Sequence, residues 1–124
     1  MCTKKLLDVG TSMWKSLDEL ISKHVACNES VIFEGDGIVP ELLATRDLHK
    51  VKSVFIYDDI DGIKKKQILR NRHGKESDEN SKNILFSHTY GQEIKRQAEE
   101  YGFLVIQASP METLFDRTIE ALKK

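Results

Sequence analysis

The sequence has little of what marks several classes of protein. Its two cysteines, Cys2 and Cys27, are too few for a disulfide framework, and neither belongs to a CxxC pair, so we expect two reduced thiols. No apolar run approaches the length that spans a bilayer. The amino terminus also lacks the apolar core and small-residue cleavage site of a secretory signal. We therefore expect a cytoplasmic protein.

The chain also has no marked excess of positive or negative charge. The chain has 19 basic and 20 acidic residues and a formal net charge of -1, so nothing in its overall charge points to nucleic acid or to an anionic membrane. Its 124 residues suit a single domain spanning 1–124. The four histidines lack metal-ligand spacing, which argues against a zinc site.

The most informative local pattern in the sequence is VIFEGDGIVP at residues 31–40. A short apolar run that breaks into alternating acid and glycine predicts a buried strand that opens into a tight loop. Such strand ends carry the chemistry of α/β proteins, and Gly35 and Gly37 would let a ligand approach the backbone closely. Glu34 and Asp36 are therefore candidates for a metal-side or phosphate-side role. The alternative is a plain turn with solvated acids.

Three further elements are predicted between residues 11 and 72. Apolar residues at helical spacing favour a helix from Thr11 to about residue 25, capped by Thr11 or Ser12, while residues 1–10 stay undecided. Residues 51–57 predict a second strand. Asp58 or Asp59 would cap the helix that follows to about residue 72, in which the lysines at 64–66 indicate a solvated face.

The second half predicts a polar, lid-like loop at 73–83 and a helix at 84–101 that Gly102 ends. Residues 103–108 are continuously apolar, which predicts a third strand buried on both faces. The SPME sequence that starts at Ser109 has the pattern of a capping box, which predicts a last helix from that point. Strands that alternate with helices favour an α/β, three-layer sandwich with a parallel sheet of at least three strands.

The order of these motifs resembles the carboxyl-terminal half or more of P-loop small-molecule kinases, especially the 2-phosphoglycerate kinase-like and other ATP-binding members. The resemblance is carried by a strand followed by EGDG-I-x-P, a strand ending in acids, and a helix ending RNRHG before a polar loop, and it covers about residues 12–124. It implies an incomplete P-loop NTPase-like core and, in intact relatives, transfer of the ATP γ-phosphoryl group to a small molecule.

The resemblance also implies roles for single residues. Glu34 and Asp36 would hold Mg²⁺ or the phosphoryl acceptor, and Arg70 and Arg72 would clamp the transferred phosphoryl group as catalytic lid residues. The backbone around Ser109 and Pro110 would border the adenine of ATP. Acids for a metal ion and arginines for phosphates are the residue types that phosphoryl transfer requires.

The sequence departs from this family at its central motif, because no GxxxxGK[ST] occurs in it. The nearest string, GTSMWKS at residues 10–16, lacks the second glycine and is one residue short. We therefore expect a kinase-like protein without its amino-terminal third, inactive by itself. The strand that would be missing leaves a gap in the sheet, which predicts a homo-oligomer.

Two alternatives stay open. The chain could be a non-catalytic module that binds a nucleotide or phosphate, or that oligomerises, without turnover. It could also be an unrelated doubly wound domain, flavodoxin-like or receiver-like, with Asp58 and Asp59 as its acidic site; only Asp8 is available as a further acid near its start, which disfavours that fold.

Overall fold

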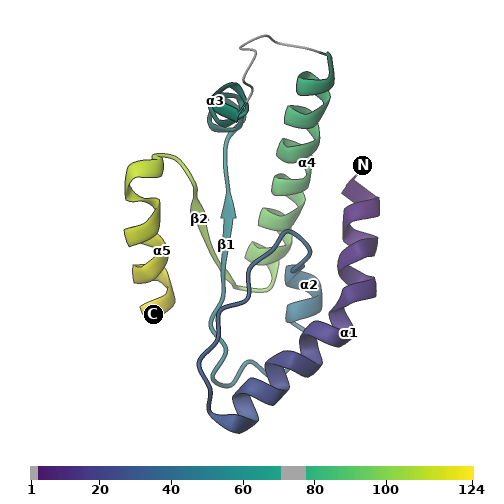
Figure 1. The fold of residues 1–124 in the computed structure, drawn as a ribbon, viewed down its shortest axis with the longest axis vertical. Helices are drawn as coiled ribbons and strands as arrows, with labels where there is room; N and C mark the ends of the chain where they lie inside the picture. Colours follow the sequence, from purple (N-terminus) through teal and green to yellow (C-terminus); the bar gives the residue numbers. More distant parts are fainter. Residues whose placement is uncertain (1–2, 71–77) are drawn as a thin grey trace. The chain divides into compact units, whose positions relative to one another are not determined.

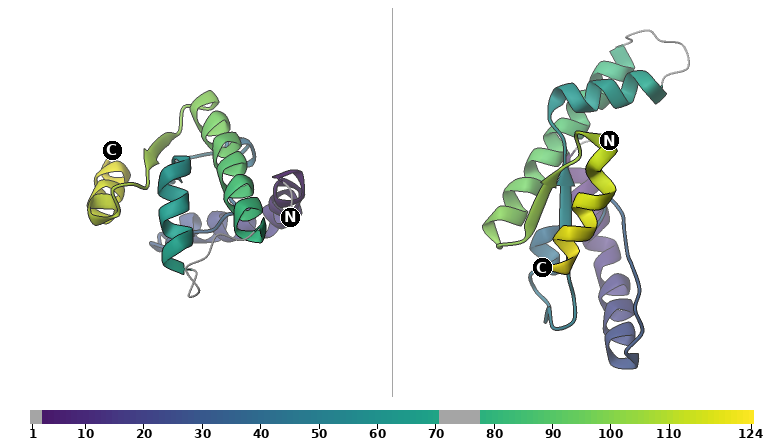
Figure 2. Two further views of the ribbon diagram at one scale, coloured as in Figure 1. Left: turned by 90° about the horizontal axis from the view of Figure 1, so that it is seen from above. Right: turned by 90° about the vertical axis from the view of Figure 1, so that its left-hand side faces the viewer.

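The computed structural model describes residues 3–70 and 78–124, without the side chains of residues 67–70 and 78–81. The chain forms two compact units, Met1–Lys52 and Ser53–Lys124, which are described one at a time. Figure 1 shows the elements with their labels and Figure 2 gives two further views.

The first unit contains a long helix, α1 (Thr3–Cys27), and a single-turn helix, α2 (Pro40–Leu43), joined by a segment without regular structure. Helix α1 begins well before the predicted position, so the predicted caps are wrong. The hydroxyls of Thr11 and Ser12 instead donate to the carbonyls of Leu7 and Asp8 inside the helix, at 3.1 and 3.0 Å. The helix ends at Cys27, and the next residue, Asn28, has a left-handed φ of 59°.

A glycine in the middle of α1 allows the connecting segment to lie against the helix. A Cβ atom on Gly10 would stand 2.7 Å from the carbonyl oxygen of Gly37 and 2.9 Å from Cγ2 of Val39. Only a residue without a side chain permits this approach. A salt bridge also joins the segment after α2 to helix α1, because the guanidinium of Arg46 donates to the carboxylate of Asp18 at 2.7 Å.

The predicted strand at residues 31–34 does not form. The segment has no strand pairing, and the side chain of Ile32 is 86% exposed. The expectation of a buried strand was wrong because a strand needs a neighbouring strand for its backbone hydrogen bonds, and an apolar run in the sequence does not supply one.

The second unit is built around two short parallel strands, β1 (Val54–Tyr57) and β2 (Leu104–Gln107), with Val54 opposite Leu104 and Tyr57 opposite Gln107. Helices α3 (Ile60–Arg70) and α4 (Asp78–Glu100) connect the two strands. A 3₁₀ turn, η1 (Met111–Thr113), and helix α5 (Leu114–Lys123) follow β2. The described residues contain only this two-stranded sheet, so the predicted three-layer sandwich with three or more parallel strands is corrected to a mainly helical chain with one parallel strand pair.

Helix α4 supplies the core of this unit. Tyr90, Ile94 and Ala98 recur every four residues, are at most 9% exposed, and lie on the face of α4 that packs against both strands. The ammonium of Lys95 lies 4.4 Å from the centre of the Tyr57 ring. Helix α4 ends as predicted near Gly102, whose φ is +77°.

The opposite face of the strand pair is less well covered. Helix α5 packs there, across the strands from α4 (Figures 1 and 2). Side chains alternate between the two faces of a strand, so Ile56 and Leu104 share this side. They remain 46% and 41% exposed, so the prediction that the third strand is buried on both faces was wrong.

Residues 78–83 of the predicted polar loop belong to the first turns of α4, and residues 73–77 lie outside the described residues. Among the described helices, none combines the length and the apolar character that crossing a membrane requires.

Candidate functional site

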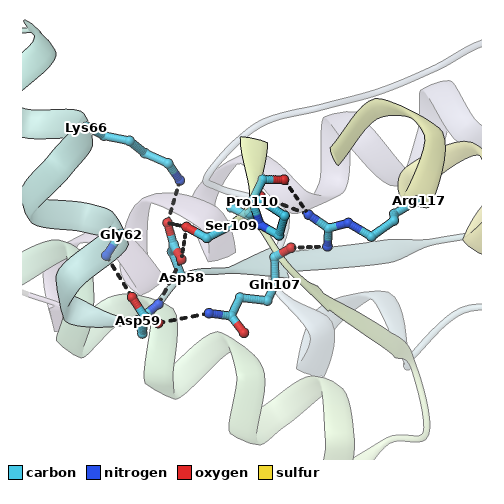
Figure 3. Close-up of polar contacts among 9 residues, drawn as sticks. Asp58, Asp59, Gly62, Lys66, Gln107, Ser109, Pro110 and Arg117 are labelled. Atoms are coloured by element: carbon cyan, nitrogen blue, oxygen red, sulfur yellow. Dashed lines mark hydrogen bonds and ion pairs between the residues drawn. The ribbon is translucent and has the colours of Figure 1, made fainter. Parts of the chain in front are cut away.

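The carboxyl ends of β1 and β2 carry a polar cluster centred on Asp58 (Figure 3). Because the two strands are parallel, the residues that follow them emerge at the same edge of the sheet. The hydroxyl of Ser109, just after β2, donates to both carboxylate oxygens of Asp58, at 2.9 and 3.1 Å. The ammonium of Lys66, on α3, lies 2.8 Å from Oδ2 of the same carboxylate. Three elements thus meet at one charged group, which we call the Asp58 cluster.

The Asp58 carboxylate is charged although it is almost fully covered, with a side chain only 4% exposed. Burial by itself raises its pKa, but hydrogen bonds from Lys66 and Ser109, the positive charge of Lys66 and the N–H of Asp59 together lower the pKa below the ordinary value of 3.8. The N–H of Asp59 donates to Oδ1 at 3.0 Å. Removing one of these partners would leave a poorly compensated buried charge.

Gly62 makes room for this carboxylate. A Cβ atom at position 62 would overlap both carboxylate oxygens of Asp58 and would lie 2.5 Å from its Cγ. The glycine lies in the first turn of α3, where it weakens the helix by its conformational freedom. It is needed there because Asp58 packs directly against its Cα.

The neighbouring acid, Asp59, has a different task. Its Oδ1 accepts a hydrogen bond from the N–H of Gly62 at 2.7 Å, which is the geometry of a helix N-cap and confirms the predicted capping role. Its Oδ2 accepts a bond from the side-chain amide of Gln107 at 3.0 Å. The cap of α3 is therefore also tied to the end of β2.

Arg117 holds the backbone of the loop between β2 and η1. Its guanidinium on α5 donates to the carbonyl oxygen of Gln107, to that of Ala108 at 3.0 Å and to that of Pro110 at 2.9 Å. Figure 3 shows the guanidinium next to the loop that carries Ser109. Charged donors bind carbonyl oxygens strongly, so Arg117 positions this loop.

Only some of the residues predicted for the site lie near the Asp58 cluster. Ser109 belongs to the Asp58 cluster, and Pro110 follows it in the loop whose carbonyls Arg117 binds. The Ser109 hydroxyl binds Asp58 and not the amide of a helix. The predicted capping box therefore does not form, and α5 begins only at Leu114. Ser109 takes part through its side chain, whereas the resemblance implied a role for the backbone alone.

The other predicted site residues lie elsewhere. Glu34 and Asp36 are exposed in the segment between α1 and α2, in the first unit. Arg70 is the last residue of α3, and its side chain is among those not described; Arg72 lies outside the described residues. The structure thus leaves the predicted lid arginines and their relation to Glu34 untested.

The sequence had indicated Asp58 as a cap and Lys66 as part of a solvated face, and Arg117 had drawn no attention. A local signal did exist for Asp58, which directly follows an apolar strand. Lys66 lies eight positions further along, so it shares a helix face with Asp58 only if the helix starts next to the strand. Arg117 had no such signal, because its acceptors are backbone carbonyls.

Comparisons with protein-family models, with curated proteins and with solved structures each found no match. The likeness to P-loop small-molecule kinases therefore remains a resemblance of motif order.

The described residues do not fit a preformed magnesium site. No group of three or more histidine, cysteine, aspartate or glutamate side chains suited to a metal ion occurs among them, and Asp58 is already occupied by an ammonium. The ATP and Mg²⁺ that the resemblance implies would need further ligands, so we derive no step through the metal.

Proposed function

We propose that this protein is a kinase-like module that binds a nucleotide or a phosphorylated small molecule at the carboxyl edge of the β1–β2 pair, and that it does not transfer a phosphoryl group by itself. The observation that carries the proposal is the Asp58 cluster, which gathers a carboxylate, an ammonium and a hydroxyl at the edge where ligands bind to open α/β sheets. The order of motifs along the sequence points to the same class of ligand.

Lys66 is the group that would meet a phosphate. An ammonium has three N–H donors, and the ion pair with Asp58 uses one of them. The Lys66 side chain is 29% exposed, whereas Asp58 beneath it is 4% exposed, so a ligand arriving from solvent reaches the cation first. Asp58 then fixes the position of the ammonium.

Arg70 and Arg72 would add the positive charge that a di- or triphosphate needs, as the resemblance implies. They follow Lys66 on α3 and in the residues after it. Without a GxxxxGK[ST] loop in the sequence, the backbone amides that cradle phosphates in an active kinase are not supplied by that motif. This is why we assign binding and not turnover.

The test is a titration of the isotopically labelled protein with ATP and, separately, with inorganic phosphate, followed by amide NMR signals and by calorimetry. We expect the signals of residues 58–66 and 109–111 to shift. Lys66→Met should weaken binding about tenfold to hundredfold, since a hydrogen bond to a charged group contributes about 1.5–3 kcal/mol. Arg70→Ala combined with Arg72→Ala should weaken ATP binding more than phosphate binding.

Lys64→Met is the matched control, because Lys64 is an exposed lysine on the same helix. It should leave the affinity close to that of the wild type. Equal losses in Lys64→Met and Lys66→Met would indicate binding by general charge, and no shift at residues 58–66 with either ligand would refute the proposed site.

A further inference from the structure

Arg117 binds one short segment of the chain with every nitrogen of its guanidinium. The two terminal nitrogens donate to the carbonyl oxygens of Gln107, Ala108 and Pro110. Nε donates to the hydroxyl of Thr113 at 2.9 Å. A guanidinium is planar and its donors have fixed directions, so several bonds made at once fix the position of the groups that they bind. Arg117 therefore determines where the loop after β2 lies.

Ser109 lies in the part of this loop that the strand pair does not hold. The backbone bonds between β2 and β1 continue as far as the N–H of Ala108, which donates to the carbonyl oxygen of Tyr57 at 2.7 Å. Ser109 follows directly, and Arg117 binds the carbonyls of the residues on either side of it. The Ser109 hydroxyl reaches both oxygens of Asp58 from this backbone position. Figure 3 shows the bonds of Arg117 and those of Ser109 together.

We propose that Arg117 is a positioning residue for the ligand of the Asp58 cluster, and that it acts through Ser109. By holding the loop, Arg117 keeps the Ser109 hydroxyl on the Asp58 carboxylate. This carboxylate in turn holds the Lys66 ammonium, 2.8 Å from its Oδ2. The inference rests on the proposed binding of a phosphate at Lys66. It extends the site to helix α5, which does not itself touch the ligand.

The role of Arg117 in position can be separated from its charge. Burial raises the pKa of the Asp58 carboxyl, and bonds from Lys66 and Ser109 lower it. If the loop moved, Asp58 would lose the Ser109 bond and would hold the ammonium less firmly. A lysine at position 117 keeps the positive charge but lacks the planar set of donors, so it changes the position of the loop and not the charge beside it.

The mutant test measures phosphate affinity by calorimetry in a double-mutant cycle of Arg117→Lys and Ser109→Ala, with circular dichroism to check that each variant is folded. Arg117→Lys should weaken phosphate binding about threefold to tenfold, which corresponds to the loss of one hydrogen bond. In the Ser109→Ala background, the same change should weaken binding by less than about twofold, because residues that act through one another are not additive. Arg117→Lys should also raise the pKa of Asp58, measured from its carboxyl carbon NMR signal.

Arg96→Lys is the matched control, because Arg96 is an exposed arginine whose guanidinium binds Glu93 and Glu100 on its own helix. It should change neither the phosphate affinity nor the pKa of Asp58. An equal loss of affinity in Arg96→Lys would overturn the inference. So would an unchanged affinity in Arg117→Lys, or a loss of the same size with and without the Ser109 hydroxyl.

The wild-type protein provides a test that no folding defect can affect. Members of one hydrogen-bond network respond to one another, so saturating phosphate should shift the Nε–H NMR signal of Arg117 and leave that of Arg96 in place. Shifts at residues 58–66 without a shift at Arg117 would overturn the inference and leave the proposed function intact. No shift at residues 58–66 would refute the proposed function, and this inference with it.

Discussion

Replacing Gly62 by alanine separates the tertiary structure from local helix propensity. By propensity alone, alanine in place of a glycine in a helix should raise the free energy of unfolding by up to about 1 kcal/mol. In the structure, the new methyl group would overlap the Asp58 carboxylate, which cannot stay where it is. The two expectations have opposite signs.

The size of the loss follows from what Asp58 would give up. Its carboxylate would move away from Lys66 and Ser109, at present 2.8 and 2.9 Å from its oxygens, while remaining close to the protein interior. Separating the partners of a buried ion pair costs about 3–5 kcal/mol, and the gain in helix propensity offsets up to about 1 kcal/mol of this. We therefore expect Gly62→Ala to lower the free energy of unfolding by about 2–4 kcal/mol.

Gly91→Ala in α4 provides the matched control, because a Cβ atom at Gly91 meets no atom within 4 Å. This variant should be as stable as the wild type or up to about 1 kcal/mol more stable. Urea unfolding followed by circular dichroism measures both variants. If Gly62→Ala were stabilised to the same extent as Gly91→Ala, the close packing of Asp58 on α3 would be refuted.

Three further predictions concern single contacts. Its partners in the fold lower the pKa of Asp58, so the charged carboxylate stabilises the fold at pH values above its ordinary pKa of 3.8, and this contribution is lost as the pH falls through the lowered pKa. In Asp58→Asn, the free energy of unfolding should therefore depend less on pH below about 5. Urea titrations at several pH values measure this dependence. Arg117→Met should lower the free energy of unfolding by about 2–4 kcal/mol, since it removes the hydrogen bonds of a charged guanidinium to three carbonyl oxygens. Arg96→Met breaks only exposed ion pairs and should have a much smaller effect. Gly10→Ala should destabilise the first unit by about 1–3 kcal/mol through contact with Gly37, measured by hydrogen exchange of α1; unchanged protection would contradict the close approach.

The polar residues of the site illustrate how the same local pattern can have different outcomes. Asp59 was predictable as a cap, because the acceptor and the N–H it binds lie three residues apart on one helix. Ser109 precedes a proline and a glutamate in the pattern of a capping box, yet its hydroxyl donates to Asp58, 51 residues away in the sequence. A hydroxyl binds the best acceptor within reach, and the sequence does not show which acceptors the fold brings close.

The sequence by itself determined the features that depend on neighbours along the chain. These include the cap of α3, the end of α4 at Gly102 and the approximate positions of β1 and β2, because turns of a helix and apolar runs are local properties. Only the tertiary structure decided whether an apolar run became a strand. Residues 31–34 and residues 54–57 have similar composition, but only the second segment has a neighbouring strand to accept its hydrogen bonds. A strand, unlike a helix, completes its backbone bonds with residues far away in the sequence.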